Sequence, residues 1–344
     1  MRFLSDNTAS ACPEMLEAIR AVNSGLEPAY SEDRWSQRLD RVFAEFFDTE
    51  VCVFSVATGT AANALALATV TPPHGAIFAH EEAHVVRDEC SAPEFFSAGA
   101  RLITIPGRHG KVTPEGLAHA LAANPPTVHT VQPAALTLTQ ASEFGTVYRP
   151  AEIAALADAA HAQRLAVHMD GARFANAVVT LGCHPGETSW RAGVDVLSFG
   201  ATKNGALGAE AVVFFDLKRV ADFELRRKRA GHLLSKSRYG AAQLLAYIES
   251  GLWRRNAERS NRLALRIGAA AAGRLLGPVE ANEVFCALGE EAKRELRHAG
   301  FEFYDWGAER SGAARFVVSW DQPEEHVAAL CAALTGAGAR VSPP

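Results

Sequence analysis

Short apolar runs alternate with segments of helical periodicity through the first two thirds of the chain. In the segment 150–163, for example, Ile153, Leu156, Ala157 and Ala160 recur at the spacing of one helix face. Other helices are expected at residues 34–47, 60–68 and 114–122. The apolar runs predict buried strands at residues 51–56, 76–78, 101–105, 135–139, 165–169, 194–199 and 211–215. This alternation predicts an α/β fold whose mainly parallel central sheet carries helices on both faces.

The last hundred residues or so follow a different pattern. A helix-rich stretch over 241–276 precedes shorter elements that are expected to be strands at 284–288, 301–306 and 315–320 and helices at 290–299 and 323–337. A chain of 344 residues also exceeds what a single hydrophobic core usually supports. We therefore expect a large domain over residues 1–240, including an N-terminal arm, and a small C-terminal α+β domain over residues 241–344.

Three of the expected strands are followed directly by residues that can carry chemistry. Thr58-Gly59-Thr60 follows the run 51–56, Asp170 follows 165–169, and Lys203 comes shortly after 194–199. Ligands of parallel sheets bind beyond the carboxyl ends of the strands. We therefore expect these three groups to face one crevice.

Together, these groups match the needs of pyridoxal 5′-phosphate (PLP). This cofactor requires an amine that forms an imine, an anion beside its pyridine nitrogen, and backbone N–H groups at a helix N-terminus for its phosphate. Lys203, Asp170 and the turn at Gly59 and Thr60 supply them, and Thr202 adds a hydroxyl for the phosphate. Each element alone has an ordinary explanation, as a surface lysine, an Asp-Gly turn or a helix cap. Their combination favours the cofactor.

Three further side chains are candidates, and two of them, His84 and Arg315, have two interpretations each. Arg173 is close enough to Asp170 to reach the phenolic oxygen of the cofactor ring. His84 could stack on that ring, or be a half-buried residue that bonds to the backbone. Arg315 could bind a substrate carboxylate with its two-pronged guanidinium, or form a surface ion pair.

Composition excludes several other classes of protein. The net charge of −5 gives no basic excess for nucleic acid. Neither a secretory signal nor an uncharged apolar stretch of membrane-spanning length is expected. The six cysteines are scattered without Cys-x-x-Cys pairs, which suggests reduced thiols in the cytoplasm, and no metal site is expected.

The motifs together resemble the threonine aldolases, which are fold type I PLP enzymes of the β-eliminating lyase branch, and in particular the low-specificity L-threonine aldolases of bacteria. The resemblance runs essentially from end to end. It is carried by the segments 5–7, 29–33, 58–63, 83–84, 88–96, 168–174, 200–205 and 314–316.

The resemblance implies a role for each matching residue. Lys203 looks like the Schiff-base lysine and Asp170 like the partner of the pyridine nitrogen, while Arg173 would bond the ring hydroxyl. The phosphate would be held by Gly59, Thr60 and Thr202; the ring would be stacked by His84; and the substrate carboxylate would be bound by Ser5 and Arg315. Tyr30, Lys236 and Arg238 match a region that reaches the neighbouring subunit's site, in a family that is usually a homotetramer built as a dimer of dimers.

One segment departs from the pattern of some relatives. Where they have an Asn-Thr-His motif near the substrate hydroxyl, this chain has Glu143 within the segment 139–145. Either His84 or Glu143 is therefore the candidate catalytic base. The implied reaction is reversible cleavage of L-threonine, L-allo-threonine and related β-hydroxy-α-amino acids, such as phenylserine, to glycine and an aldehyde. The alternatives are β-elimination or another PLP reaction on this scaffold, or a protein that kept only the fold.

Overall fold

The computed structural model describes residues 1–307 and 312–338 and has a seven-stranded sheet at its centre. The strand order is β1-β7-β6-β5-β4-β2-β3. Strands β2 to β6 run parallel, whereas β7 is antiparallel to both of its neighbours. The strands are β1 (Cys52–Val56), β2 (Gly75–His80), β3 (Arg101–Ile105), β4 (Gln132–Thr139), β5 (Ala166–Gly171), β6 (Val196–Gly200) and β7 (Glu210–Phe214). The expected α/β fold is thus confirmed, with every predicted strand of this sheet present.

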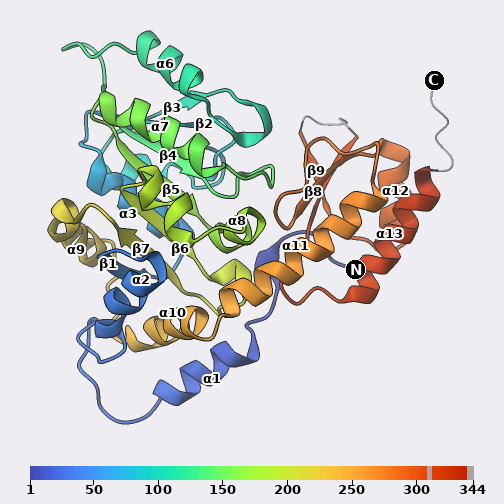
Figure 1. Ribbon diagram of the computed structural model, residues 1–344, viewed down its shortest axis with the longest axis horizontal. Coiled ribbons are helices and arrows are strands. Elements are labelled where there is room, and N and C mark those ends of the chain that lie inside the picture. Colours follow the sequence, from blue (N-terminus) through green and yellow to red (C-terminus); the bar gives the residue numbers. More distant parts are fainter. Residues whose placement is uncertain (308–311, 339–344) are drawn as a thin grey trace.

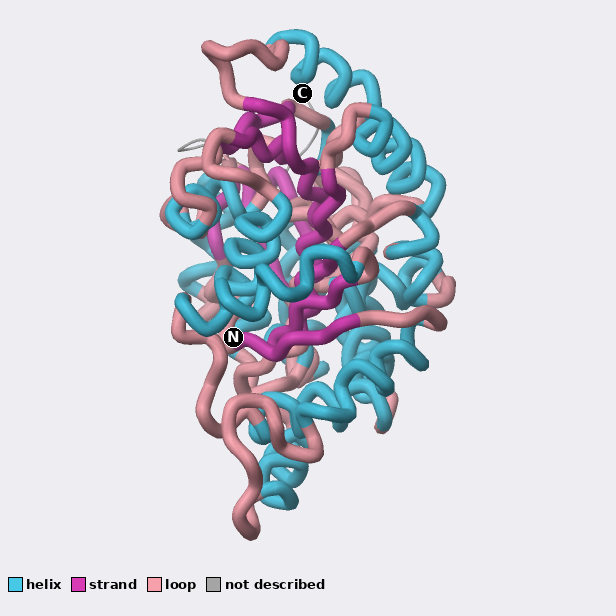
Figure 2. Tube along the Cα trace, turned by 90° about the vertical axis from the view of Figure 1, so that its left-hand side faces the viewer, coloured by secondary structure: helices cyan, strands magenta, loops and turns pink. Residues whose placement is uncertain are grey.

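Both faces of the sheet are buried, because successive strand residues enter two different apolar layers. Val53 and Leu197 lie in one layer, while their neighbours Phe54 and Val196 lie in the other. The first layer is covered by α2 (Leu39–Phe47), α6 (Pro114–Ala123), α7 (Pro150–Ala162), α8 (Phe174–Leu181) and α10 (Arg238–Glu249). The second is covered by α3 (Gly59–Val70) and α9 (Val220–Arg229). Figures 1 and 2 show the strands as a twisted band between helices.

The C-terminal part contains a three-stranded antiparallel sheet of order β8-β10-β9. It comprises β8 (Glu283–Ala287), β9 (Tyr304–Trp306) and β10 (Ala313–Val317). Its core packs against α11 (Leu252–Ala270), α12 (Glu290–His298) and α13 (Glu324–Gly338). Two predicted strands needed adjustment. The one expected at 315–320 begins and ends earlier, and the one expected at 301–306 is shorter.

The N-terminal arm begins in the C-terminal part rather than in the part it precedes. Phe3 is buried in the core of the small sheet, and its carbonyl accepts a hydrogen bond of 2.9 Å from the Val317 amide. The N-terminus accordingly lies beside α11 and α13, and α1 (Pro13–Val22) continues the arm beneath α10 (Figure 1). The arm therefore links the two parts, and a division at residue 240 stays a prediction.

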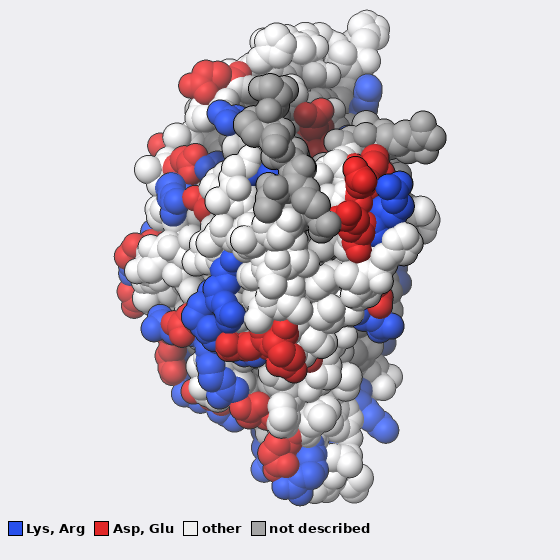
Figure 3. Space-filling model, turned by 90° about the vertical axis from the view of Figure 1, so that its right-hand side faces the viewer, with Lys and Arg blue, Asp and Glu red and all other residues white. Residues whose placement is uncertain are grey.

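Charge on the face over the C-terminal part is mixed. Lys and Arg side chains are interspersed there with Asp and Glu around an uncharged area (Figure 3). Arg262 and Arg266, for example, both pair with Glu324 across α11 and α13. The last turn of α9 carries a run of four basic residues, 226–229, and this run is partly buried in the fold. Arg227 is buried and donates to the hydroxyls of Ser31 and Ser55.

The close approach of β6 to the turn after β5 gives a testable prediction. A Cβ added to Gly200 would lie 2.7 Å from the carbonyl oxygen and 2.8 Å from the Cα of Ala172. Because these are backbone atoms, Gly200→Ala should lower the free energy of unfolding by about 1–3 kcal/mol, measured by urea denaturation. Gly240→Ala is the matched control, since its Cβ would meet nothing closer than 3.8 Å. An unchanged stability in Gly200→Ala would contradict this account.

Candidate active site

A cavity of about 280 Å³ lies at the edge of the central sheet where β1, β5 and β6 end. It is lined by Asn7, Ala57, Thr58, Gly59, Thr60, Asn63, His84, Glu143, Asp170, Ala172, Thr202, Lys203 and Glu210. The structure thus brings together seven predicted site residues: Gly59, Thr60, His84, Glu143, Asp170, Thr202 and Lys203. Their convergence follows from the topology, because the carboxyl ends of parallel strands share one edge.

The N-terminus of α3 offers unused hydrogen-bond donors to the cavity. Thr58 caps the helix, with its hydroxyl accepting from the Ala61 amide at 3.1 Å. The amides of Gly59 and Thr60 make no hydrogen bond within the described residues, and a Cβ added at Gly59 would meet nothing within 4 Å. Free N–H groups and the positive end of a helix dipole form an anion site.

Asp170 is held in place by two hydrogen bonds. Its Oδ1 accepts from the Ala172 amide at 3.0 Å, and its Oδ2 accepts from Asn63 Nδ2 at 2.9 Å. Only 4 % of the residue is exposed. The same Asn63 Nδ2 donates to Glu89 Oε1 at 2.8 Å. A buried, oriented carboxylate is the group that a protonated ring nitrogen requires.

His84 is linked to Asp170 through this network. Its Nδ1 lies 2.8 Å from Glu89 Oε1, and this hydrogen bond raises the pKa of the imidazole. Burial raises the pKa of Glu89 as well. The ring is thereby fixed by Nδ1, which leaves Nε2 as its unbonded nitrogen in the described structure. Neither Asn63 nor Glu89 had been assigned a role from the sequence, although both lie in the motifs that carried the resemblance.

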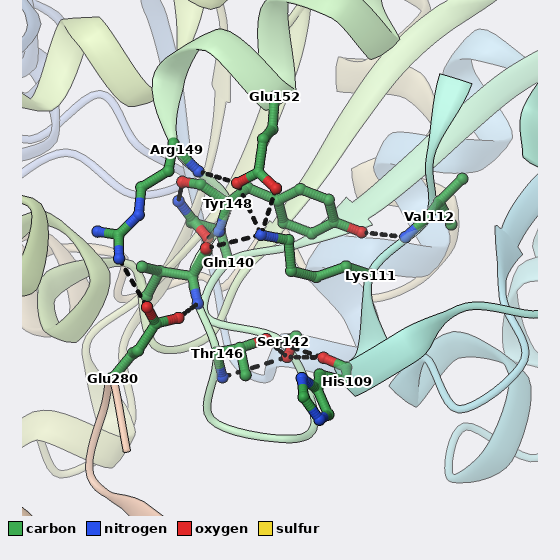
Figure 4. Close-up of polar contacts among 11 residues, drawn as sticks. His109, Lys111, Val112, Gln140, Ser142, Thr146, Tyr148, Arg149, Glu152 and Glu280 are labelled. Carbon is green, nitrogen blue, oxygen red and sulfur yellow. Dashed lines mark hydrogen bonds and ion pairs between the residues drawn. The ribbon is translucent and has the colours of Figure 1, made fainter. Parts of the chain in front are cut away.

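The loop that carries Glu143 is braced on both sides. The Gln140 side chain bonds to both the amide and the carbonyl of Tyr148, each at 2.9 Å. The hydroxyls of Ser142 and Thr146 lie 2.8 Å apart, and the Tyr148 hydroxyl accepts from the Val112 amide (Figure 4). These contacts hold the loop closed, and its Glu143 side chain lines the cavity.

Glu143 also lines a second hollow of about 690 Å³, together with Phe144, Trp306 and Arg315. It therefore lies where the two spaces meet. Burial raises the pKa of its carboxyl, against the opposing effect of Lys203 and Arg173. Arg315 lines this second hollow but not the first cavity.

Arg173 lies in a buried ion-pair cluster behind the cavity, outside its lining residues. Its guanidinium pairs with Asp6 at 2.7 Å and with Glu283 at 3.4 Å, and Glu283 also pairs with Arg315 at 3.2 Å. Burial acts to raise the pKa of Asp6, but the charges of Arg173 and Lys203 outweigh it and hold this pKa at about 2. The expected hydrogen bond from Arg173 to the ring hydroxyl of the cofactor stays a prediction.

Four other expected residues lie outside the cavity lining. Ser5 caps a short 3-10 helix, Asp6–Thr8, by accepting from the Asn7 amide at 3.1 Å. Tyr30 is half exposed beneath Lys228, Lys236 is exposed, and Arg238 donates to the carbonyl of Gly25. Within one chain, the last three thus do not contribute to the site.

Glu210 is a lining residue that the sequence did not suggest. It is the first residue of β7. In a parallel sheet, the first residues of the strands lie at the edge opposite to the active site. Because β7 runs antiparallel to both of its neighbours, its first residue instead lies beside the ends of β1 and β6. Only the strand's direction could have revealed this position.

Comparison with known proteins agrees with the geometry. The sequence pattern of the beta-eliminating lyase family matches residues 2–290. A low specificity L-threonine aldolase of a Pseudomonas species is 42% identical over 335 residues, which cover 96% of each chain. Its counterpart in Pseudomonas aeruginosa is 44% identical and covers 96% of this chain and 95% of that one.

Solved structures show the same fold. The threonine aldolase of Leishmania major superimposes with a TM-score of 0.91 at 23% sequence identity, and covers 97% of this chain and 98% of that one. A putative L-allo-threonine aldolase of Listeria monocytogenes gives a TM-score of 0.75 at 15% identity, with 98% and 96% covered. The chain therefore belongs to the beta-eliminating lyase family.

Proposed function

We infer that this protein is a PLP-dependent aldolase that reversibly cleaves L-threonine, L-allo-threonine and related β-hydroxy-α-amino acids to glycine and an aldehyde. The observation that carries the proposal is the convergence of Lys203, Asp170 and the free N-terminus of α3 on one cavity. The names of the Pseudomonas relatives support the same reaction. When bound, PLP supplies an electron sink for the charge that remains at Cα as the Cα–Cβ bond breaks.

The cavity residues fit this cofactor. Lys203 would supply the amine that bonds to it covalently, and Asp170 the anion for its pyridine nitrogen. The orphan amides of Gly59 and Thr60, with Thr202, would hold the phosphate. His84, which Glu89 fixes, would stack on the ring. Arg173, which pairs with Asp6 and Glu283, is proposed to bond the ring hydroxyl.

The second hollow is the place for the rest of the substrate. Arg315 and Ser5 are proposed to bind the substrate carboxylate. Arg315 would then exchange its ion pair with Glu283 for one with the substrate. Glu143 lines both this hollow and the cavity with Lys203, which supports its proposed role as acceptor of the β-hydroxyl proton. A base with a raised pKa suits this task near neutral pH. His84 is the other candidate base.

The proposed oligomer is a homotetramer built as a dimer of dimers. Tyr30, Lys236 and Arg238 lie at or near the surface and away from their own chain's cavity, which supports a role at a neighbouring subunit's site. In the described part of the chain, no helix is both long and apolar enough to cross a membrane. The tetramer, the cytoplasmic location and the lack of nucleic-acid partners stay predictions.

Lys203→Ala should abolish the release of acetaldehyde and glycine from L-threonine, because no amine then binds the cofactor and prepares it for exchange with substrate. The visible absorption spectrum of the purified variant with added PLP should also differ from that of the wild type. Lys218→Ala, which removes an exposed lysine, should leave both unchanged. Retained cleavage in Lys203→Ala would contradict the proposal, and ammonia with a keto acid as wild-type products would indicate β-elimination instead.

The pH dependence of cleavage should identify the base. A base acts when deprotonated, so kcat/KM should fall as pH drops through the raised pKa of Glu143. Glu143→Gln should lower kcat by about 10²–10⁴-fold and remove this acid limb. His84→Asn is the comparison variant and should keep the limb, because it leaves Glu143 in place. If instead His84→Asn removed the acid limb and Glu143→Gln kept it, His84 would be the base.

A further inference from the structure

Glu210 lies between the two segments proposed to receive the cofactor's phosphate. In the sheet register it pairs with Val56 on one side, two residues before the Thr58 cap of α3. On the other side it pairs with Gly200, two residues before Thr202. Its side chain is 6 % exposed and lines the cavity. The carboxyl is therefore built into the floor of the phosphate site.

Glu210 and an incoming phosphate would use the same donors. The Thr202 amide donates to Glu210 Oε1 at 3.3 Å, and the Thr202 hydroxyl also bonds to this carboxyl. Thr202 Oγ1 in turn accepts from the Ala209 amide at 3.2 Å. An ionised carboxylate only accepts hydrogen bonds, and so does a phosphate dianion. The two groups can therefore bond to each other directly only if a proton lies between them.

The surroundings favour the protonated form. Three titratable groups face Glu210 from the elements around it: Lys203, Asp170 and Tyr247. Burial raises the pKa of Glu210 to about 7, although Thr202 and Lys203 act to lower it, and Asp170 adds to the rise. A phosphate brings about −1.5 to −2 charges at neutral pH, which shifts the carboxyl further toward its neutral form.

We propose that Glu210 binds the phosphate of the cofactor as a neutral carboxylic acid, so that the protein takes up one proton at this side chain when the cofactor binds. The inference rests on the proposed PLP function. The carboxyl O–H donates to a phosphate oxygen, and its other oxygen keeps the hydrogen bond from the Thr202 amide. Solvent supplies the proton, and no covalent bond changes at Glu210.

This linkage weakens phosphate binding as pH rises. Below the pKa of free Glu210, about 7, the proton is already present and affinity is unaffected by this group. Above it, the apparent Kd increases by up to about tenfold per pH unit, until the pH reaches the higher pKa of the complex. Glu210 thus makes cofactor loading most favourable on the acid side of neutrality.

The test uses ligands that cannot react with Lys203. Pyridoxine 5′-phosphate lacks the aldehyde, and pyridoxine also lacks the phosphate. Calorimetry from about pH 6 to about pH 9 gives both dissociation constants, and their ratio isolates the phosphate contribution to the pH dependence. In the wild type, the advantage of the phosphorylated ligand should shrink with rising pH. In Glu210→Gln it should be steady above neutrality, because an amide donates without titrating.

The ligand's own phosphate titration is the same in both proteins and cancels in the comparison. Glu143→Gln is the matched control, since it removes another cavity carboxyl away from the β7 edge, and it should keep the wild-type slope. Equal slopes in wild type and Glu210→Gln would overturn the inference, while binding of the phosphorylated ligand would still support the cofactor site. No preference for the phosphorylated ligand at any pH would overturn both.

Infrared difference spectra give a readout that does not depend on affinity. Binding of pyridoxine 5′-phosphate above neutral pH should add the carbonyl band of a protonated carboxyl, which is absent in Glu210→Gln. If that variant fails to fold, Glu210→Asp should shift the band, because it changes the carboxyl that carries the proton. A wild-type spectrum without the band would show that Glu210 stays ionised and would refute the proposal.

Discussion

The site depends on a sheet that is buried on both faces and open only at its ends. Since apolar layers cover both faces, a ligand can reach the backbone only where strands finish. At one such edge, α3 begins directly after β1 with two orphan amides, and Asp170 and Lys203 follow β5 and β6. The small residues of α3 let it lie buried against the sheet, which places its N-terminus in the cavity rather than in solvent.

A second constraint is the buried charge cluster behind the cavity. Asp6 comes from the N-terminal arm, Arg173 from the turn after β5, and Glu283 and Arg315 from the small sheet. Ionised groups in such surroundings are costly unless they are paired, so each of these segments holds the others in position. The pairing of Arg315 with Glu283 also places the proposed carboxylate-binding group at the border of the second hollow. The cluster thus joins the two parts of the molecule at the active site.

The cavity itself is rich in carboxyl groups that differ in their surroundings. Asp170 is fixed by two donors, Glu143 is half-buried and lines two spaces, and Glu210 accepts a hydrogen bond from the Thr202 amide. Such differences let similar side chains keep different protonation states, which is how one site can combine an anion, a base and an acid. In the proposed enzyme these roles fall to Asp170, Glu143 and Glu210 respectively.

The sequence by itself determined the strands, the order of the main helices and the residues that follow the strand ends. These depend on local periodicity and on the shared edge of parallel strands, so Lys203, Asp170 and the Gly59 turn could be placed together without coordinates. Tertiary structure alone decided the rest. It paired Arg173 with Asp6, 167 positions earlier in the chain, and placed Arg315 at a second hollow. It also brought in Glu210 through the antiparallel direction of β7, because strand direction is set by long-range pairing and has no local signal.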